Sequence, residues 1–238
     1  MPRVAVIIPA LNEEEAIPAV LAQIPAVADS VTVVDNGSTD ATAALAAAAG
    51  ARIVREPRRG YGRACLAGLE AARDADIVVF LDADLSDFPA DMTRLVEPIV
   101  RDEVDFVLGA RGGAGRPGHA RTGTGLCVWL INRLWGTAYS DLGPFRAIRR
   151  QALDRLGMQD VTWGWTIEMQ VKAAEAKLRV REVPVRQRER IGQSKISGTV
   201  VGTVRAGSRM LAMIAGLWWT HGGRRKRYAA LSRGAHIG

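Results

Sequence analysis

Short apolar runs rich in β-branched residues alternate with helical patterns through the first half of the chain. The runs predict strands at residues 3–10, 31–35, 52–55, 76–83 and 105–109. The segments between them predict helices at residues 17–24, 41–49, 62–74 and 91–100. Strands that alternate with helices form parallel pairs joined by helical crossovers. The pattern therefore predicts an α/β domain whose mostly parallel sheet carries helices on both faces.

The second half of the chain continues with a different order of elements. A turn into a strand is predicted at 141–150, a helix at 165–178 and a final strand within 179–190. Before them, residues 125–139 predict a helix, and its apolar face is expected to consist of Leu126, Trp129, Leu130, Leu134 and Trp135. No internal repeat and no clear second-domain boundary interrupts the pattern.

The balance of charge favours an anionic partner. The chain has 238 residues, of which 48% are hydrophobic, so it can bury a substantial core. Lysine and arginine number 32 against 25 acidic residues, which gives a formal charge of +7. Most of the arginines follow residue 101. Such a chain is suited to phosphorylated substrates, anionic lipid or nucleic acid.

Cysteines and apolar segments bear on the compartment. Cys65 and Cys127 show neither disulfide-framework nor zinc-ligand spacing, which favours a reducing compartment. Acidic residues follow the first apolar run, where a secretory signal would have its cleavage site. The apolar run at 210–220 is shorter than the roughly 20 residues of a membrane-spanning helix. We therefore expect a cytoplasmic protein.

Carboxylates crowd onto the end of the fourth predicted strand. Asp82 and Asp84 lie two residues apart on a segment expected to be extended, so both side chains should project to one side. Like charges so close repel each other unless a cation lies between them, and carboxylate oxygens suit Mg²⁺ or Mn²⁺. The alternative is that aspartates here only end the strand and cap the next helix. We expect that simpler role for Asp87 and Asp91.

Polar residues also follow the other predicted strands, where ligands of parallel sheets bind. Asp35 ends the second strand and is suited to accept hydrogen bonds from a ribose or base, and Asn12 and Glu13 follow the first strand. A helix start with two glycines suits anions and carries three arginines, Arg58, Arg59 and Arg63. The chain lacks G-K-[ST] and, after its first strand, G-x-G-x-x-G, which disfavours nucleoside-triphosphate hydrolysis and dinucleotide binding.

The order of the motifs resembles a known family. In chain order the motifs are VIIPALNEEEAI, VVDNGSTDAT, GYGRACLAGL, FLDADLSD, VLGAR and RIGQSKIS. Together they resemble the family 2 inverting glycosyltransferases of the GT-A fold, most closely the dolichyl- or polyprenyl-phosphate mannose (or glucose) synthase type. The resemblance implies a GT-A glycosyltransferase domain over residues 1–198. Residues 199–238 would then form a C-terminal amphipathic helix with a basic tail.

The resemblance also implies roles for residues at matching positions. Asp82 and Asp84 would bind the metal ion, Mg²⁺ or Mn²⁺, and the nucleotide-diphosphate sugar, and Asp35 would contact its uridine or guanosine. Arg190 and Lys195 would approach the diphosphate or a lipid phosphate. The wider set of nucleotide-sugar-binding residues would include Pro9, Asn12, Glu13, Asn36, Arg63 and Ala83.

Two acceptor classes stay open. A polyprenyl or dolichyl phosphate is already anionic and nucleophilic, so it needs no strong base; its phosphate would contact Arg111, Arg146 and Arg190. A hydroxyl of a saccharide or small molecule needs a carboxylate to take its proton. Glu168 is the first candidate for that base and Asp141 the second. We expect transfer from a GDP-mannose or UDP-glucose type of donor to a lipid phosphate, with the hydroxyl acceptor as the alternative.

The chain departs from its relatives at three places. Many relatives carry a metal-binding glutamine where this chain has Ser86, so coordination would be completed by Asp84, phosphates and water. The acceptor-side strand reads Gly143-Pro144-Phe145-Arg146, where relatives usually have threonine and glycine. Relatives often have C-terminal transmembrane helices, and none is evident here.

Other features favour a membrane surface and disfavour two other classes. Trp218 and Trp219 precede the basic run 224–227, a combination typical of an interfacial helix on anionic lipid. We therefore expect peripheral binding to the cytoplasmic face of a membrane. A sugar nucleotidyltransferase would have a glycine-rich segment after its first strand. Acidic strand ends argue against a nucleic-acid partner. The three histidines are scattered and are expected at the surface: His119, His221 and His236.

Overall fold

The protein is described by a computed structural model that covers residues 1–111, 118–192 and 210–220. The strands are β1 (Val4–Ala10), β2 (Ser30–Asp35), β3 (Arg52–Arg55), β4 (Ile77–Phe80), β5 (Phe106–Arg111), β6 (Arg146–Arg149) and β7 (Val180–Val185). The helices are α1 (Ile17–Leu21), α2 (Thr42–Ala48), α3 (Tyr61–Ala71), the 3-10 turn η1 (Pro89–Asp91), α4 (Met92–Val100), α5 (Gly118–Trp135), α6 (Arg150–Leu156) and α7 (Trp165–Glu175). Residues 210–220 form one further helical segment.

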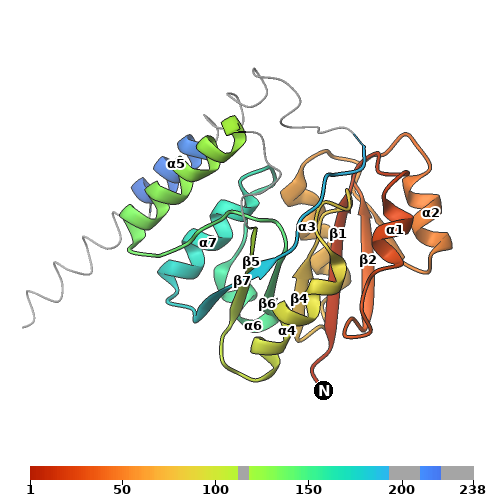
Figure 1. Cartoon of the computed structure of the whole chain (residues 1–238), viewed down its shortest axis with the longest axis horizontal. Coiled ribbons are helices and arrows are strands. Elements are labelled where there is room, and N and C mark those ends of the chain that lie inside the picture. Colours follow the sequence, from red (N-terminus) through yellow and green to blue (C-terminus); the bar gives the residue numbers. More distant parts are fainter. Residues whose placement is uncertain (112–117, 193–209, 221–238) are drawn as a thin grey trace, which may run out of the picture.

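The strands form one seven-stranded sheet in the order β3-β2-β1-β4-β6-β5-β7. Strand β6 pairs antiparallel with both of its neighbours, and the other pairs are parallel. Helices lie on both faces of the sheet (Figure 1). The predicted α/β class with a mostly parallel sheet is therefore confirmed.

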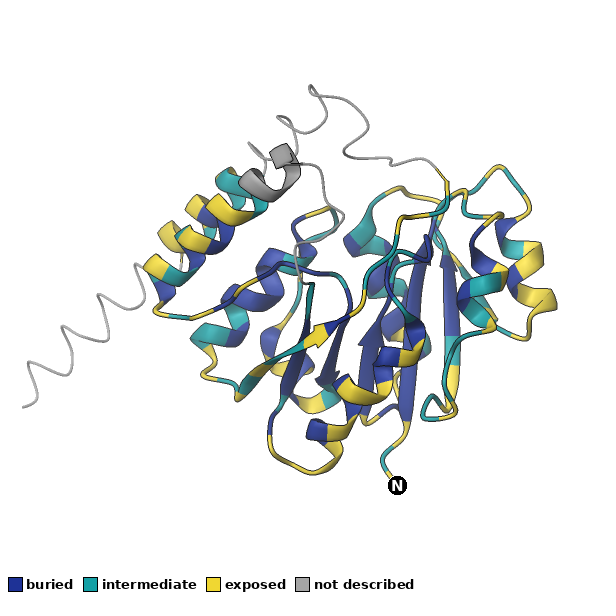
Figure 2. Cartoon of the chain, in the orientation of Figure 1, coloured by how far each residue is buried: buried dark blue, intermediate teal, exposed yellow. Residues whose placement is uncertain are grey.

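The alternation of side chains along the strands builds two cores. In β1, Val6 and Ile8 belong to a cluster with α1, α2 and α4, while Ala5 and Ile7 belong to a cluster with α3, α5, α6 and α7. Every residue of β1 and of β4 is buried, because both faces of these central strands are covered (Figure 2). The continuous apolar runs in the sequence are the consequence of this double coverage.

The predicted apolar face of helix α5 is partly wrong. Leu126 is 47% exposed and Trp129 is 59% exposed, whereas Cys127, Val128 and Ile131 are buried in the core. Positions 127, 131 and 135 recur every four residues and therefore share one side of the helix. Two large apolar side chains are left facing outward.

The helix at 210–220 packs on the same core as α5. Ile214 is 2% exposed and belongs to the cluster that contains Cys127 and Ile131, and Figure 1 shows this helix beside α5. The predicted domain limit at residue 198 lies outside the described residues. Within the described residues, no helix combines the length and the apolar character needed to cross a membrane.

Candidate active site

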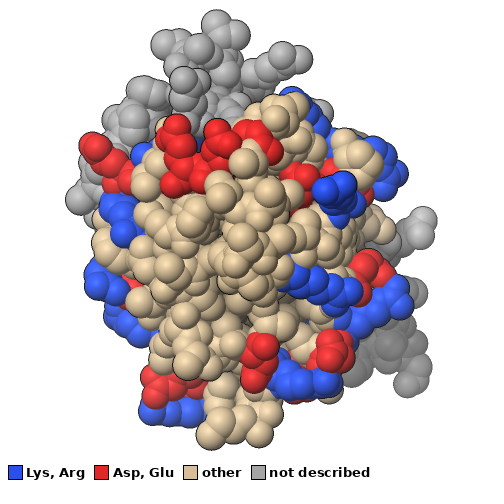
Figure 3. Space-filling model, turned by 90° about the vertical axis from the view of Figure 1, so that its right-hand side faces the viewer, with Lys and Arg blue, Asp and Glu red and all other residues tan. Residues whose placement is uncertain are grey.

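Strand order brings polar residues together at one edge of the sheet. Ala10 of β1 pairs with Asp35 of β2, and Ile7 of β1 pairs with Phe80 of β4. The three strands are parallel, so the loops that follow them emerge at the same edge. Figure 3 shows acidic side chains gathered along this edge on the side of the molecule that carries α1 and α2.

Asp82 lies just beyond the end of β4 and contacts helix α3. The hydroxyl of Tyr61, the first residue of α3, donates a hydrogen bond to Asp82 Oδ1 at 3.1 Å. Burial raises the pKa of Asp82 to about 6, and the nearby carboxylate of Asp87 adds to the rise. A cation bound to this carboxylate would reverse that penalty.

The expectation that Asp82 and Asp84 share one side of an extended strand is wrong. Strand β4 ends at Phe80, and the chain turns at Ala83 and Asp84 before Leu85 adopts a left-handed φ of 61°. The carboxylate of Asp84 accepts the backbone N–H of Ser86 at 2.9 Å. The turn rather than strand pleating sets the directions of the two carboxylates.

Arg190 lies near the end of the described segment 118–192 and forms an ion pair with Asp84. The backbone N–H of Ile191 donates to the carbonyl of Asp84 at 3.0 Å, so main chain and side chain both hold this segment against the turn. The positive charge of Arg190 also acts on Asp82, where it opposes the rise in pKa that burial causes. The structure thus joins two sequence motifs that are more than 100 residues apart.

Residues 186–188, just before Arg190, pack against the loop that follows β4. The backbone N–H of Arg188 donates to Ser86 O at 3.0 Å, and the Arg188 guanidinium lies 4.1 Å from the centre of the Phe88 ring. Arg186 forms an ion pair with Asp91 at 2.7 Å. Asp91 therefore anchors residues 186–191, which corrects the prediction that it only decorates the next helix.

Asp87 is also more than a helix-starting residue. It is 2% exposed, and neither of its carboxylate oxygens has a hydrogen-bond partner among the described residues. Burial raises its pKa to about 6, with Arg111 opposing the rise and Asp141 adding to it. Its side chain makes no capping bond to η1 or α4. An uncompensated carboxylate at this depth lowers stability at neutral pH.

The loops after β1 and β2 are tied to each other. Asn12 adopts a left-handed φ of 51°, and its Oδ1 accepts the backbone N–H of Thr39 at 2.8 Å. Asp35 Oδ1 accepts the N–H of Ser38 at 2.9 Å. A Cβ on Gly192 would lie 3.7 Å from Glu13 Oε2, so the segment after Arg190 reaches the loop after β1. Asn12, Glu13 and Asp35 are therefore gathered at one edge as predicted.

Asn36 has a scaffold role in this structure instead of a ligand-facing one. It is 5% exposed, and its side-chain amide donates to the carbonyls of Glu56 and Arg58, each at 2.9 Å. Its Oδ1 accepts the N–H of Gly60 at 2.8 Å. Direct contact of the Asn36 side chain with a nucleotide sugar is thus contradicted by its burial; it positions the loop before α3.

Two other members of the predicted nucleotide-sugar set are buried. Pro9 lies within β1, and Ala83 is 4% exposed in the turn after β4. Neither presents a polar side chain, so any contact with a ligand would be through backbone or apolar atoms. Lys195 lies outside the described residues.

The start of helix α3 is packed against a loop at 157–163. A Cβ at Gly60 would collide with Val161 O, and a Cβ at Gly62 would collide with Asp160 O. The N–H of Gly62 donates to Thr162 O at 3.0 Å. The glycines of the GYG motif are therefore required by this close approach.

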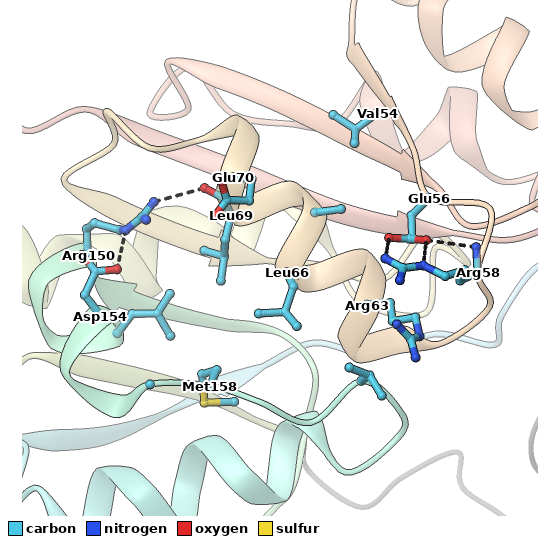
Figure 4. A pocket seen from close by; sticks show the side chains of 14 residues that line it. Val54, Glu56, Arg58, Arg63, Leu66, Leu69, Glu70, Arg150, Asp154 and Met158 are labelled. Atoms are coloured by element: carbon cyan, nitrogen blue, oxygen red, sulfur yellow. Dashed lines mark hydrogen bonds and ion pairs between the residues drawn. The ribbon is translucent and has the colours of Figure 1, made fainter.

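Arg63 lines a groove that does not include Asp82 or Asp84. This groove of about 600 Å³ lies between α3 and α6, with Arg58 and Glu56 at the same end as Arg63 and Leu66 and Met158 along it (Figure 4). Arg58 is paired with Glu56 at 3.1 Å. The described geometry therefore gives no direct support to Arg63 as a diphosphate contact beside Asp82.

Arg146 is not available to an acceptor phosphate. It is 0% exposed, and its guanidinium donates to the carbonyls of Gly143 and Thr166 and to Gln170 Oε1. Burial lowers its pKa to about 10. A phosphate would have to displace these buried contacts, so the prediction for Arg146 is wrong in this structure. The residue instead ties Gly143 to Thr166 and Gln170 of helix α7.

Arg111 is bound to Asp141, the second base candidate. Arg111 Nε lies 2.6 Å from Asp141 Oδ2, and Nη2 lies 3.1 Å from Oδ1, a bidentate pair that is largely buried. A Cβ on Gly143 would lie 3.1 Å from Arg111 Nε and 3.2 Å from Asp141 Oδ2. The charge of Arg111 nevertheless acts on Asp82 and Asp87, so it lies within electrostatic reach of the acidic turn.

Glu168 is buried rather than exposed on its helix. It is 4% exposed and accepts the backbone N–H groups of Gln159 and Asp160 as well as an ion pair from Lys172 at 2.7 Å. These contacts fix the loop at 157–163. The carboxylate is occupied by structural donors, which argues against its predicted role as the base.

Sequence reasoning missed Tyr61 and Trp163. The ring of Trp163 stacks on that of Tyr61, with centroids 6.1 Å apart and planes at 25°, and Tyr61 in turn contacts Asp82. Trp163 is 41% exposed. The two residues are about 100 positions apart in the sequence, and no local sequence pattern predicts their contact.

Comparison with known proteins agrees with this arrangement. The model of the family described as glycosyl transferase family 2 matches residues 5–157. An uncharacterised glycosyltransferase of Mycobacterium tuberculosis (strain ATCC 25618 / H37Rv) is 43% identical over 84% of this chain and 93% of its own. The undecaprenyl-phosphate mannosyltransferase of Micrococcus luteus is 32% identical over 84% of this chain and 90% of its own.

A solved structure has the same fold. Glucosyl-3-phosphoglycerate synthase from Mycobacterium tuberculosis, in complex with Mn²⁺, uridine diphosphate and glucosyl-3-phosphoglycerate, aligns with a TM-score of 0.73 and 26% identity. The alignment covers 90% of this chain and 80% of that one. The match of the family and the likeness of the fold together lead to one conclusion: the chain belongs to glycosyl transferase family 2 and is a glycosyltransferase with a GT-A type of fold.

Proposed function

We propose that the protein transfers a sugar from a nucleoside-diphosphate sugar to a polyprenyl phosphate. The observation that carries the proposal is the meeting of Arg190 with Asp84 at the edge where β1, β2 and β4 end. Carboxylates for a metal ion and a guanidinium for phosphate oxygens are then side by side, as departure of a diphosphate requires.

Asp82 and Asp84 would hold a divalent cation, Mg²⁺ or Mn²⁺. The donor set fits, because Asp84 already attracts a cationic side chain and Asp82 carries the penalty of a buried negative charge. Among the described residues no group of three or more His, Cys, Asp or Glu side chains is arranged as a metal cage. Mg²⁺ commonly binds one or two carboxylates and takes its other ligands from phosphates and water. The bound ion would stabilise negative charge on the leaving diphosphate.

The residues around the turn would bind and orient the donor. Asp35, Asn12 and Glu13 lie at the same edge and would contact the nucleoside, while Arg190, once released by Asp84, would donate to diphosphate oxygens. Lys195, five residues further along the chain, would add a second cation. Solved structures of glucosyl-3-phosphoglycerate synthase hold Mn²⁺ or Mg²⁺ together with uridine diphosphate, which supports the donor side of the proposal.

A lipid phosphate is the acceptor that the contacts favour. Both carboxylates considered as a base are occupied, Glu168 by backbone donors and Lys172, and Asp141 by Arg111. A phosphate is already ionised at neutral pH and needs no base. The relatives named as a dolichyl-phosphate hexose transferase of Haloferax volcanii and an undecaprenyl-phosphate mannosyltransferase support the same class. Arg190 remains the candidate for the acceptor phosphate, because the guanidinium of Arg111 is held by Asp141 in a largely buried pair.

A second candidate is transfer to a hydroxyl of a phosphorylated small molecule. The observation in its favour is the likeness to a synthase whose structure was solved with phosphoglyceric acid, at a TM-score of 0.74 and 27% identity. This reaction would require Glu168 or Asp141 to leave its present partners and accept the hydroxyl proton.

Binding to a membrane surface would place the enzyme beside its acceptor. Large apolar side chains are exposed on α5 and on the helix at 210–220: Leu126 at 47%, Trp129 at 59%, Trp218 at 46% and Trp219 at 80%. Exposed tryptophans next to the basic run 224–227 are suited to the interface of an anionic bilayer. We therefore expect peripheral association at the cytoplasmic face.

One incubation separates the two acceptors. Purified protein is mixed with Mg²⁺, one of a panel of radiolabelled nucleotide sugars, and either a short polyprenyl phosphate or 3-phosphoglycerate. The proposal expects label in the organic phase with one donor, and loss of that transfer when EDTA is added. Label that stays in water and appears on 3-phosphoglycerate would overturn the lipid acceptor.

A further inference from the structure

We propose that Trp163 is a specificity-determining residue that contacts the first isoprene units of the acceptor chain. This inference rests on the proposed function, because it assigns the apolar part of the lipid whose phosphate would enter beside Asp82 and Arg190. Trp163 would then select a prenyl phosphate over a phosphate without a hydrocarbon chain.

Trp163 is connected to Asp82 through the side chain of Tyr61. Its indole stacks on the ring of Tyr61, and the Tyr61 hydroxyl donates to Asp82 Oδ1 at 3.1 Å. Trp163 remains 41% exposed, so part of the indole is open to solvent a short distance from the candidate metal site. Large apolar surface left open beside a polar site favours a ligand with both characters.

The loop that carries Trp163 is held rigidly. Glu168 accepts the N–H groups of Gln159 and Asp160, and the carbonyl of Thr162 accepts the N–H of Gly62 at 3.0 Å. The loop that carries the exposed indole is therefore fixed by hydrogen bonds to α7 on one side and to α3 on the other. A rigid aromatic surface binds a partner with little loss of side-chain entropy.

Trp163 also adjoins the helix at 210–220. Its neighbour Gly164 is buried, and a Cβ placed there would collide with Sδ and Cε of Met213. The same helix exposes Trp218 and Trp219 to solvent. The helix at 210–220 therefore lies against the residue after Trp163 through Met213 and carries two exposed tryptophans further along, which gives an apolar chain a path towards the surface expected to meet the membrane. A prenyl chain that leaves its phosphate at the site would follow this path and bury apolar area along it.

The polar groups beside the indole do not favour a sugar ring at this position. Asp160 Oδ1 accepts the backbone N–H of Thr162 at 2.8 Å and also its hydroxyl, so these two side chains satisfy each other. A saccharide stacked on Trp163 would need partners for its hydroxyl groups, whereas a hydrocarbon chain needs none. The occupant that fits is the isoprenoid segment next to the phosphate.

The test compares acceptors of different chain length in detergent, so that membrane docking does not enter the measurement. Trp163→Ala, Trp163→Phe and the wild type are assayed with citronellyl phosphate and with a polyprenyl phosphate of several isoprene units. Trp163→Ala is expected to raise KM for both prenyl phosphates about tenfold, equivalent to about 1.4 kcal/mol, because both acceptors contain the first isoprene units. The KM for the nucleotide sugar should stay within twofold, and Trp163→Phe should recover most of the loss.

A distant exposed apolar residue supplies the matched control. Leu45 on α2 is 37% exposed, and Leu45→Ala should leave both KM values unchanged. A KM for both prenyl phosphates that is the same in Trp163→Ala as in the wild type would overturn the inference while the proposed function stands. Failure of the wild type to use any prenyl phosphate would overturn both.

Discussion

Among the described residues three buried aspartates are paired with arginine, and two of these pairs, Arg111 with Asp141 and Arg190 with Asp84, differ in access. Arg111 and Asp141 have side-chain exposures of 12% and 6%, and their contact is bidentate. In the pair of Arg190 and Asp84 the carboxylate is 5% exposed but the arginine is 38% exposed. One pair is closed and the other is open on its cationic side.

The difference in access implies a difference in function. A closed pair cannot lose one member without leaving a charge buried, so it acts as scaffold. An open pair can exchange its arginine for a metal ion, because the released guanidinium is solvated or bound by phosphate. The pair of Arg186 and Asp91 is open too, but it anchors residues 186–191, whereas Asp84 lies two residues from Asp82 at the strand-end edge. We therefore propose Asp84 and Arg190 for the reaction, and Asp141 for the support of Arg111.

The largest effect is expected from Asp84→Asn. Asparagine keeps an oxygen for the Ser86 N–H, so the turn should survive, but it loses the negative charge for the cation. Transfer should fall about 10³-fold, which corresponds to about 4 kcal/mol. Steady-state kinetics at saturating Mg²⁺ and a thermal melt give the two readings. Near wild-type turnover would place the metal site elsewhere.

Asp141→Asn should act on stability more than on chemistry. The change leaves the Arg111 charge buried without its partner, and breaking such a pair costs about 3–5 kcal/mol. Chemical denaturation should show this loss, whereas Asp84→Asn should shift the midpoint less, because the Arg190 that it leaves behind is 38% exposed and can be solvated. If both variants lose equal stability, the distinction between closed and open pairs is wrong.

Asp87 predicts a pH dependence of stability. Its pKa in the folded protein is about 6, above the ordinary value of 3.8, so the folded state holds the proton more tightly than the unfolded state. Stability should therefore decrease as pH rises from 4 to 6, by up to about 3 kcal/mol for a shift of about two units. Denaturation in EDTA at several pH values would measure this loss.

The variant Asp87→Asn isolates the contribution of Asp87 to the pH dependence of stability. The substitution should flatten the decrease between pH 4 and 6, while Asp82, whose pKa is also about 6, preserves part of it. A profile with the same slope as wild type would mean that Asp87 gains a partner in solution.

Arg190→Lys gives the smallest expected change. Lysine keeps the charge but loses the planar fork that suits phosphate oxygens. A decrease of about tenfold in kcat with a similar KM for the donor is expected, equivalent to about 1.4 kcal/mol. Wild-type kcat in this variant would show that charge alone is needed at this position.

Much of the fold follows from sequence pattern. The runs at 31–35 and 52–55 match β2 and β3 within one residue, because apolar β-branched runs and helical periods are local signals. The fourth strand was expected to continue to residue 83 but ends at Phe80. Its continuation is apolar at Leu81, which is buried in the core, so composition does not reveal where pairing stops.

The gathering of candidate residues at one edge of the sheet was predictable where it depends on strand ends. Asp35, Asp82 and Asp84 were found from position alone, because parallel strands deliver the residues after them to one edge. The burial of Arg146, Asn36 and Glu168 was not predictable. Each is polar and sits in an ordinary motif, and only packing from other parts of the chain covers it.

The sequence by itself determined the α/β alternation, the acids at strand ends and the family resemblance, since all three are encoded in local order. The tertiary structure decided which charges are free to act. Arg190 meets Asp84 and Trp163 meets Tyr61 across about 100 residues of chain. Such contacts depend on the turn after β4, the glycines of α3 and the return of residues 186–191, and long-range packing of this kind has no periodic signal in the sequence.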